Sequence, residues 1–403
     1  MTDTIAPAAT DIGGSRVRLH RLVATLAVTQ TVGYGVLYYA FSVLITPMAA
    51  DLHASTPRIA AALTVSVLLS ATVAVPVGRW LDHHGGRLLM AVGSLLGVVA
   101  VAAWSQVRTP TQLYAVFVVI GIASAMSLYE AAFSVVIAAT EPGARNRSLL
   151  AITVVAGFAS SIFFPLTGWL TEAVGWRTTL VVLSLLLAIT AIPGHLLAVP
   201  NSAVHRGHTR MHVGQSVTTT LRDIRFWLLG SAFIMQAAAT AAVGVLLVTV
   251  LRQAGHSATT AATLAGLLGV LSVTGRLATT ALARRFGIAS VTAAVFALQA
   301  SGIAALPFVS DSVTGAAICV IAFGVGFGVA TIAKPAILAE RYGTTRYATI
   351  AGTLAVPITL AKAVAPMAAA LLAPRSFMIL AAAACLVASV LLPAAGRSTA
   401  SPR

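Results

Sequence analysis

Four ionisable residues stand inside long apolar stretches of this 403-residue chain. Glu130 lies in "SLYEAAF", Arg276 in "TGRLATT", Lys334 in "TIAKPAI" and Lys362 in "TLAKAVA". The two lysines are the only ones in the chain, although Lys and Arg together number 25. Because a charge in hydrocarbon is costly and usually functional, these four side chains are the first candidates for chemistry.

The three cations differ in how far they lie from the ends of their apolar stretches. Lys362 falls near the middle, so we expect it to face a cavity or a partner and to contact substrate. Lys334 lies nearer an end and leaves two interpretations open: an anchor that extends to the membrane interface, or a partner of Glu130. Arg276 is either a second substrate-binding cation or a helix-end charge that serves topology.

Glu130 is the one carboxylate well inside a predicted span. Burial favours the protonated form of a carboxyl group and a nearby cation favours the ionised form, so such a group can load and release a proton. We therefore predict that Glu130 couples protons, with Lys334 as its partner. The alternative is a fixed structural ion pair between Glu130 and a cation of the second half.

Aromatic residues supply candidate walls for a pocket around these charges. Tyr34 and Tyr38 are four residues apart, so a regular helix places them on one face, and we predict that they line the substrate site. Tyr39 and Tyr129 are neighbours that could contribute. For each of them, helix packing or a position in an interfacial aromatic belt remains open.

The elements that position these residues follow from composition. The chain is 58% hydrophobic and 9% charged, whereas soluble domains are about 25% charged. A membrane-spanning helix needs about 20 mostly apolar residues. Twelve stretches meet this requirement: 22–48, 59–78, 88–106, 112–139, 148–171, 178–199, 226–251, 258–282, 288–309, 312–339, 347–372 and 376–395.

The polar segments between these stretches predict the topology. The longest, Pro200 to Arg225, predicts a linker between two six-helix bundles. If the N-terminus is placed inside, 18 arginines fall on inner segments and 5 on outer ones, which predicts cytoplasmic termini in a multi-pass protein of the plasma (inner) membrane. The predicted units are a tail (1–20), a bundle (21–199), the linker (200–225), a second bundle (226–395) and a tail (396–403).

Several other function classes find no support in the sequence. The net charge of +15 is explained by arginines retained on one side of a membrane, and no nucleic-acid motif is visible. No phosphate-binding loop, metal cluster or nucleophile constellation occurs, so we expect no cofactor, no metal and no catalytic residue. Cys319 and Cys385 lie in apolar runs and are expected to be buried thiols. The glycines at 324, 326 and 328 follow no strand and are expected to permit bending or close packing.

The two halves also look related to each other. Glu141 and Arg147 in the first half have the same spacing as Glu340 and Arg346 in the second. Aligning the turn glycines that follow these glutamates places Lys334 opposite Ser134, about one helical turn from the level of Glu130. Such weak internal symmetry is typical of transporters built from repeats, whose site lies between the repeats near the midplane.

The loop "GRWLDHHGGRLLM" between the second and third stretches carries a family resemblance. Gly78, Asp82, Gly85 and Arg87 match the Gly-x-x-x-Asp-x-x-Gly signature with following basic residues, which resembles the signature loop of the major facilitator superfamily. A second copy, "TALARRFGIAS", keeps only part of the pattern. The resemblance implies twelve spans, alternating access, and a gate in which Asp82 pairs with an arginine and pulls two helices together. The alternative is that Asp82 only terminates its span.

Within that superfamily, "GYGVLYYAFSVLITPM", Arg276 and Lys362 resemble the monocarboxylate and oxalate–formate branch. This implies a secondary active transporter, acting as a monomer in the bilayer, that moves a small organic anion such as a carboxylate together with protons. The alternative is a proton-driven multidrug or metabolite efflux pump, with Glu130 as the proton carrier and the cations in structural roles.

Overall fold

The computed structural model describes residues 12–201 and 216–395, and in these ranges all regular structure is helical. The predicted tails and most of the predicted linker lie outside the described residues. The helices of the first half are α1 Ile12–Tyr34, α2 Ala40–Asp51, α3 Thr56–His84, α4 Arg87–Trp104, α5 Pro110–Ser127, α6 Tyr129–Ala139, α7 Pro142–Gly157 and α8 Ala159–Ala198. Those of the second half are α10 Val217–Arg222, α11 Ile224–Gln253, α12 Ala258–Phe286, α13 Ile288–Val309, α14 Val313–Phe327, α15 Ala330–Tyr342, α16 Tyr347–Ala370 and α17 Pro374–Ala394.

The described residues contain 11 helical segments that are long and apolar enough to cross a membrane. The longest, Pro142–Ala198, has 57 residues and would be about 86 Å long if straight, nearly three times the thickness of a bilayer core. Gly175 breaks it with φ 78° and ψ 158°, between the fifth and sixth predicted spans. Counted as two, it gives the twelve spans that the sequence predicts. The chain is an all-α, multi-pass membrane protein.

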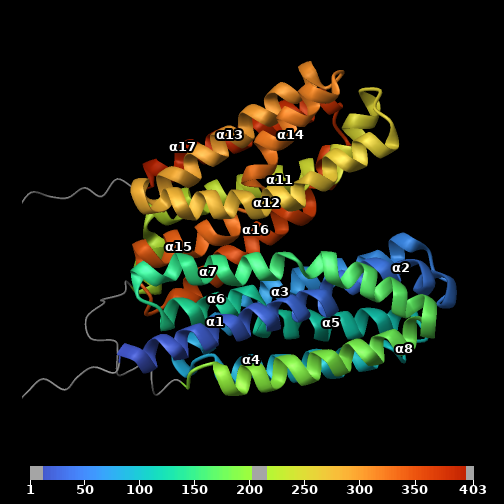
Figure 1. The fold of residues 1–403 in the computed structure, drawn as a ribbon, viewed down its shortest axis with the longest axis vertical. Coiled ribbons are helices and arrows are strands. Elements are labelled where there is room, and N and C mark those ends of the chain that lie inside the picture. The colour runs from blue at the N-terminus through green and yellow to red at the C-terminus, as the bar shows by residue number, and fades with distance from the viewer. Residues whose placement is uncertain (1–11, 202–215, 396–403) are drawn as a thin grey trace, which may run out of the picture.

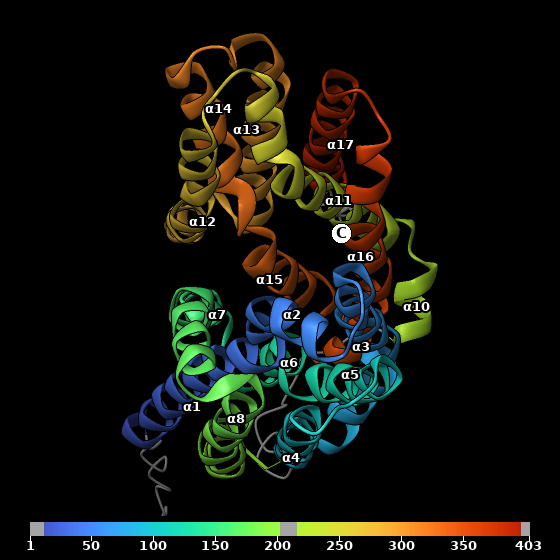
Figure 2. The ribbon, with the colours of Figure 1, turned by 90° about the vertical axis from the view of Figure 1, so that its right-hand side faces the viewer.

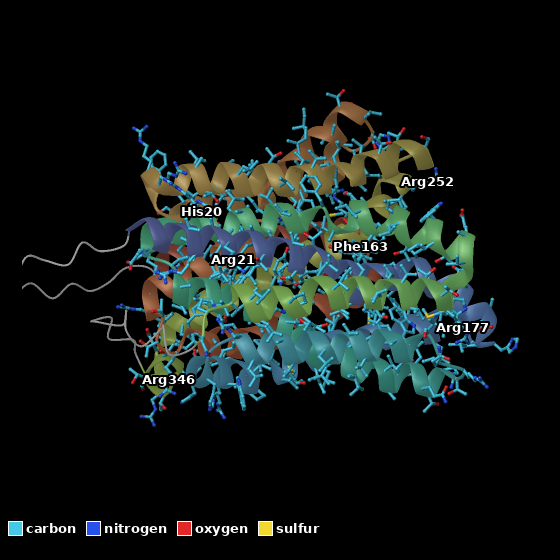
Figure 3. The ribbon with its side chains drawn as sticks, turned by 60° about the horizontal axis from the view of Figure 1, so that its bottom comes forward. His20, Arg21, Phe163, Arg177, Arg252 and Arg346 are labelled. Carbon is cyan, nitrogen blue, oxygen red and sulfur yellow. The ribbon has the colours of Figure 1, made fainter. Side chains whose placement is uncertain are left out.

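The helices form two groups that lie side by side (Figures 1 and 2), α1–α8 in one and α11–α17 in the other. The start of α1 and the end of α17 lie at the same end of the molecule, at the left of Figure 1, which we call the termini end. Arg21 and Arg346 lie toward this end, and Arg177 and Arg252 toward the opposite end (Figure 3). Arg177 holds that opposite end of the first group together, because it pairs with Asp51 at 2.6 Å and donates to the Ser105 carbonyl at 2.7 Å.

The buried apolar side chains show where the two groups touch. One cluster at the termini end contains residues of both groups, among them Phe133, Ile152, Ile337 and Leu354. Toward the opposite end, each group has its own cluster and shares no core with the other. The ribbons of the two groups accordingly diverge from the termini end (Figure 1). The molecule is therefore closed at the termini end.

Two glycines end helices in related loops. Gly85 after α3 and Gly287 after α12 have φ of 79° and 78°, a region in which a side chain on Cβ is strained. Each donates its backbone N–H to the carbonyl four residues earlier, at Leu81 and Ala283. Gly85 of the signature loop is thus required by the backbone at this turn.

Three predicted spans are not continuous helices, which the sequence interpretation did not anticipate. Span 4 breaks at Leu128, which has an extended backbone (φ −89°, ψ −162°). Span 10 breaks at Gly328, and span 5 at Phe158. The breaks at 128 and 328 are 200 residues apart, the same offset as the turn glycines Gly143 and Gly343. Interrupted helices at matching places in two repeats are typical of transporter binding sites.

Candidate functional site

An ion pair joins the two helix groups at the broken spans. Lys334 on α15 donates from Nζ to Glu130 Oε1 on α6, at 2.6 Å. The side chain of Glu130 is 40% exposed and that of Lys334 is 13% exposed. The contact that the internal alignment made possible is therefore present, with an accessible carboxylate and a largely enclosed amine. Lys334 pairs with Glu130 in this structure and does not extend to the interface as an anchor.

The break at Leu128 places Glu130. Because the helix restarts at Tyr129, Glu130 stands in the first turn of α6, where the helix dipole stabilises a negative charge. The break also frees a carbonyl in an apolar span, and such a group needs a partner. Gln30 on α1 provides it by donating from Nε2 to the Ser127 carbonyl at 2.8 Å. No feature of the sequence interpretation pointed to Gln30.

Lys362 is exposed on α16. It lies close enough to Lys334 and Glu130 to interact electrostatically with both. Among the described residues, the two ion pairs are Arg177–Asp51 and Lys334–Glu130, and no hydrogen bond of the Lys362 ammonium is found in that part of the chain. Lys362 is thus a cation with a free ammonium beside the Glu130–Lys334 pair.

Arg276 on α12 is anchored to the backbone. Its Nε donates to the Gly328 carbonyl at 3.2 Å and its Nη1 to the Thr153 carbonyl of α7 at 2.9 Å. The bond to Gly328 satisfies a carbonyl at the break in span 10. The bond to Thr153 joins the two helix groups. A guanidinium has five N–H donors, so the two bonds leave others for a ligand. Arg276 is more than a helix-end charge, since it joins the groups at the level of the second break.

The tyrosines of span 1 lie on a helix that is not regular. A π-helical turn, Gly35–Tyr39, interrupts the α-helix, and Ala40 donates its N–H to the Gly35 carbonyl. A π turn has a wider i→i+5 spacing than an α-helix, so Tyr38 and Tyr39 both stand about one turn after Tyr34, and both lie within electrostatic range of it. Tyr39 lies within electrostatic range of Arg276. Tyr38 is 39% exposed and packs edge-on against Tyr39 at 5.3 Å.

An aromatic cluster encloses Glu130 on one side. Tyr34 packs against Tyr129 with ring centroids 4.5 Å apart, and Tyr129 stacks on Phe133 at 4.9 Å. Tyr34 is also within electrostatic range of Glu130. The cluster thus combines an apolar wall with phenol groups directly beside the charged residues.

The signature loop contacts the other helix group at the termini end. Asp82 accepts bonds from the backbone N–H groups of Ala348 (3.1 Å) and Thr349 (2.9 Å) and from the Thr349 hydroxyl (2.5 Å). Asp82 therefore caps the N-terminus of α16, a position that favours an anion. The expected arginine partner is not within ion-pair distance in the described residues, although Arg346 lies in electrostatic range.

Two glycines allow helices α3 and α16 to pack closely where they cross. A Cβ at Gly78 would lie 2.3 Å from the Ala348 carbonyl oxygen, and a Cβ at Gly352 would lie 2.6 Å from the Ala74 carbonyl oxygen. Arg87 does not take part in the crossing, because its Nε donates to the Val199 carbonyl within its own group at 2.7 Å. The loop thus joins α3 to α16 through Gly78 and Asp82, while Gly85 and Arg87 shape the loop itself.

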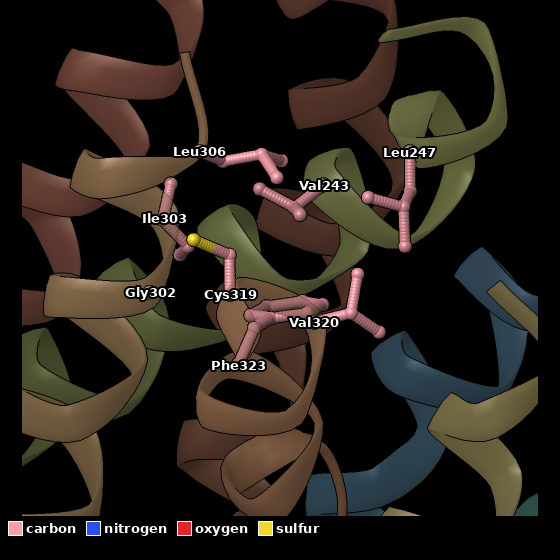
Figure 4. A pocket seen from close by; sticks show the side chains of 8 residues that line it. All are labelled: Val243, Leu247, Gly302, Ile303, Leu306, Cys319, Val320 and Phe323. Atoms are coloured by element: carbon pink, nitrogen blue, oxygen red, sulfur yellow. The ribbon is translucent and has the colours of Figure 1, made fainter. Parts of the chain in front are cut away.

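Two hollows in the described residues lie apart from the charged site, because neither is lined by Glu130, Lys334, Lys362 or Arg276. A hollow of about 990 Å³ at the termini end is lined by both groups, including Arg18, Arg87, Glu141, Arg145 and Glu340. A void of about 10 Å³ in the second group is lined only by apolar side chains and the Cys319 thiol (Figure 4). The void has room for one water at most, so it is not a substrate site.

The chain was compared with known proteins. The family model of the Major Facilitator Superfamily matches residues 26–366. A search of curated proteins found no match.

Solved structures similar to the chain agree with the family model. The human organic anion transporter MFSD10 is 17% identical over 94% of this chain and 99% of its own, with a TM-score of 0.69. The E. coli fucose:proton symporter is 14% identical over 93% and 98%, with a TM-score of 0.70. A bacterial homologue of the iron transporter ferroportin, in an outward-facing state, is 16% identical over 94% and 99%, with a TM-score of 0.73. These likenesses concern the fold.

Proposed function

This chain belongs to the major facilitator superfamily, and we propose that it moves a small organic anion, such as a carboxylate, coupled to protons by alternating access. It is a secondary transporter and not an enzyme. We further propose that it works as a monomer in the plasma (inner) membrane, with the termini end facing the cytoplasm. The excess of arginines at the predicted inner segments supports this orientation.

The observation that carries the proposal is the free ammonium of Lys362 beside the Glu130–Lys334 pair. The carboxylate of Glu130 offsets the charge of Lys334, so Lys362 and Arg276 leave the site with an excess of positive charge. An anionic substrate would restore the balance. A cationic substrate would meet repulsion from both of these side chains.

The ion pair also provides a route for coupling. When Glu130 takes up a proton, Lys334 loses its charged partner and can bind the carboxylate of a substrate instead. Substrate and proton then load together, and the tyrosines beside Glu130 contact the rest of the substrate. Because the pair joins the two groups, the change at Glu130 also alters the contact that holds them together.

The remaining contacts between the groups form the proposed gate. Asp82 on the N-terminus of α16 and Arg276 on the Thr153 carbonyl both hold the termini end closed. Opening that end requires both sets of bonds to break. A substrate carboxylate that binds the guanidinium of Arg276 would weaken its bond to the Thr153 carbonyl, so substrate loading would favour opening.

The second candidate function is a proton-driven efflux pump for amphipathic compounds, favoured by the aromatic cluster around Tyr34 and Tyr129. A transport screen in proteoliposomes with an imposed pH gradient separates the two, comparing small carboxylates with lipophilic cations. We expect uptake of a carboxylate, loss of that uptake in Lys362→Ala, and partial uptake in Lys362→Arg. Carboxylate uptake that is unchanged in Lys362→Ala would refute the anion site and favour the pump.

A further inference from the structure

Helix α1 contacts three consecutive residues at the break in span 4. Gln30 donates to the Ser127 carbonyl at 2.8 Å. Gly33 leaves room for Leu128, because a Cβ at Gly33 would lie 2.8 Å from Leu128 Cδ2. Tyr34 packs against Tyr129, the first residue of α6, at 4.5 Å. Contacts with α1 therefore help to determine the conformation of the break, in addition to the local sequence.

Gln30 is the polar member of this contact, and it carries an unsatisfied group. Its side chain is fully buried, at 0% exposure. Its Oε1 atom has no hydrogen-bond partner among the described residues. Exchanging Oε1 and Nε2 would point an oxygen at the Ser127 carbonyl, so the donor orientation is required. A buried amide with one bond made and one missing is costly, so Gln30 is an unfavourable residue at this place unless its bond to Ser127 offsets the cost.

The bond between Gln30 and the Ser127 carbonyl affects the position of Glu130. Ser127 ends α5, and Glu130 stands three residues later in the first turn of α6. If the break closed into a regular helix, the chain after Leu128 would rotate. The carboxylate of Glu130 would then be displaced relative to the ammonium of Lys334. The carbonyl of Ser127 would then take an N–H from α6 in place of the Gln30 amide.

We propose that Gln30 is a positioning residue, which fixes the break at Leu128 through the Ser127 carbonyl and so holds Glu130 against Lys334. The inference rests on the proposed coupling role of Glu130. Besides Lys334, the titratable groups in the described residues that lie within electrostatic range of Glu130 include Lys362 and Tyr347 on α16 and Tyr34 on α1. None of these bonds to the break, so a change at Gln30 acts on Glu130 through its position.

The test uses a probe that needs no substrate. Dicyclohexylcarbodiimide modifies protonated carboxyl groups in apolar surroundings. The full-length protein reacts in nanodiscs at pH 7, and mass spectrometry of the peptide that contains Glu130 follows the modification at that site. Gln30→Met removes the donor and keeps the side-chain length. We expect it to raise the modification rate at Glu130 about fivefold, to the rate of Lys334→Met, because Lys334 would no longer hold the carboxyl group in an ion pair.

Two further variants separate positioning from folding. Gln30→Asn keeps a buried amide but is one methylene too short to meet Ser127, so it should behave like Gln30→Met. Gln236→Met removes the buried glutamine of α11, which bonds to Thr240 and Gln299 in the second group. It should leave the modification of Glu130 unchanged.

Each outcome decides the inference. Wild-type modification rates in both Gln30 variants, with a raised rate in Lys334→Met, would overturn the positioning role and leave the proposed function standing. A wild-type rate in Lys334→Met would overturn both, because the ion pair would then not control Glu130. Loss of folded protein in both Gln30 variants, with Gln236→Met still folded, would also overturn the positioning role. Gln30 would then be required for folding of the protein.

Discussion

Replacing Asp82 with alanine should release the termini end of the molecule. The carboxylate accepts three hydrogen bonds from Ala348 and Thr349 across the two helix groups. In Asp82→Ala, the first turn of α16 loses its cap, while the neighbouring apolar contacts between α3 and α16 remain. The perturbation therefore acts on the closed state and leaves each helix group intact.

The size of the effect follows from those bonds. Losing a helix cap costs about 0.5–2 kcal/mol, and buried hydrogen bonds to a charged group make a net contribution of about 1.5–3 kcal/mol. Because Asp82 is only partly buried, water recovers part of this sum, and a loss of about 2 kcal/mol is expected. This corresponds to about a 30-fold rise in the ratio of open to closed molecules. Thr349→Val removes only the hydroxyl bond and should shift the ratio about fivefold.

The assay is a distance measurement between spin labels at exposed positions of the two groups near the termini end, Arg147 on α7 and Arg284 on α12. A longer-distance population should grow in Asp82→Ala and, to a smaller extent, in Thr349→Val. Asp51→Ala is the matched control, because Asp51 pairs with Arg177 inside the first group, and it should leave the distribution unchanged. A wild-type distribution in Asp82→Ala would refute the role of this cap in closing the molecule.

Three further outcomes are expected. Gly78→Ala should populate the same open state as Asp82→Ala in the distance measurement, because the added methyl would lie 2.3 Å from a backbone carbonyl oxygen of α16; an unchanged distribution would contradict the close crossing. In a thermal-unfolding cycle, Glu130→Gln and Lys334→Met should couple by about 1 kcal/mol, and strictly additive effects would show that the pair contributes nothing. Cys319 and Cys385 are buried and should react with maleimide only on unfolding, whereas rapid labelling of the folded protein would contradict their burial.

The all-helical, multi-pass architecture and the presence of charged residues within the spans could be predicted from the sequence, whereas the cytoplasmic placement of the arginines stays a prediction. Long apolar runs require helices in a bilayer, and charges stand out against them. The contact between Glu130 and Lys334 was one of two interpretations that the sequence left open for Lys334, and the internal repeat made it possible because the alignment brought both residues within about one turn of the same level. The glycines in "GVGFGVA" were expected to permit bending or close packing, but the break in span 10 at Gly328 itself was not predicted.

The break at Leu128 could not be predicted in the same way. The sequence "AMSLYEA" contains neither proline nor glycine, and leucine is a strong helix former. The break depends on Gln30, which is almost one hundred positions away. The π turn Gly35–Tyr39 was also not predicted from the sequence, and it brings Tyr39 beside Tyr38 as a second candidate next to Tyr34. The partner of Asp82 was also missed, because a helix N-terminus attracts a carboxylate as an arginine does but leaves no charged residue in the sequence.

The central claim is that the Glu130–Lys334 pair links proton binding to substrate movement. The most direct measurement compares the wild-type protein with Glu130→Gln in proteoliposomes, using a carboxylate that the wild-type protein transports. Glu130→Gln should still exchange labelled for unlabelled substrate across the membrane, but it should no longer accumulate substrate when a pH gradient is imposed. Accumulation by Glu130→Gln with the wild-type dependence on the gradient would contradict the account.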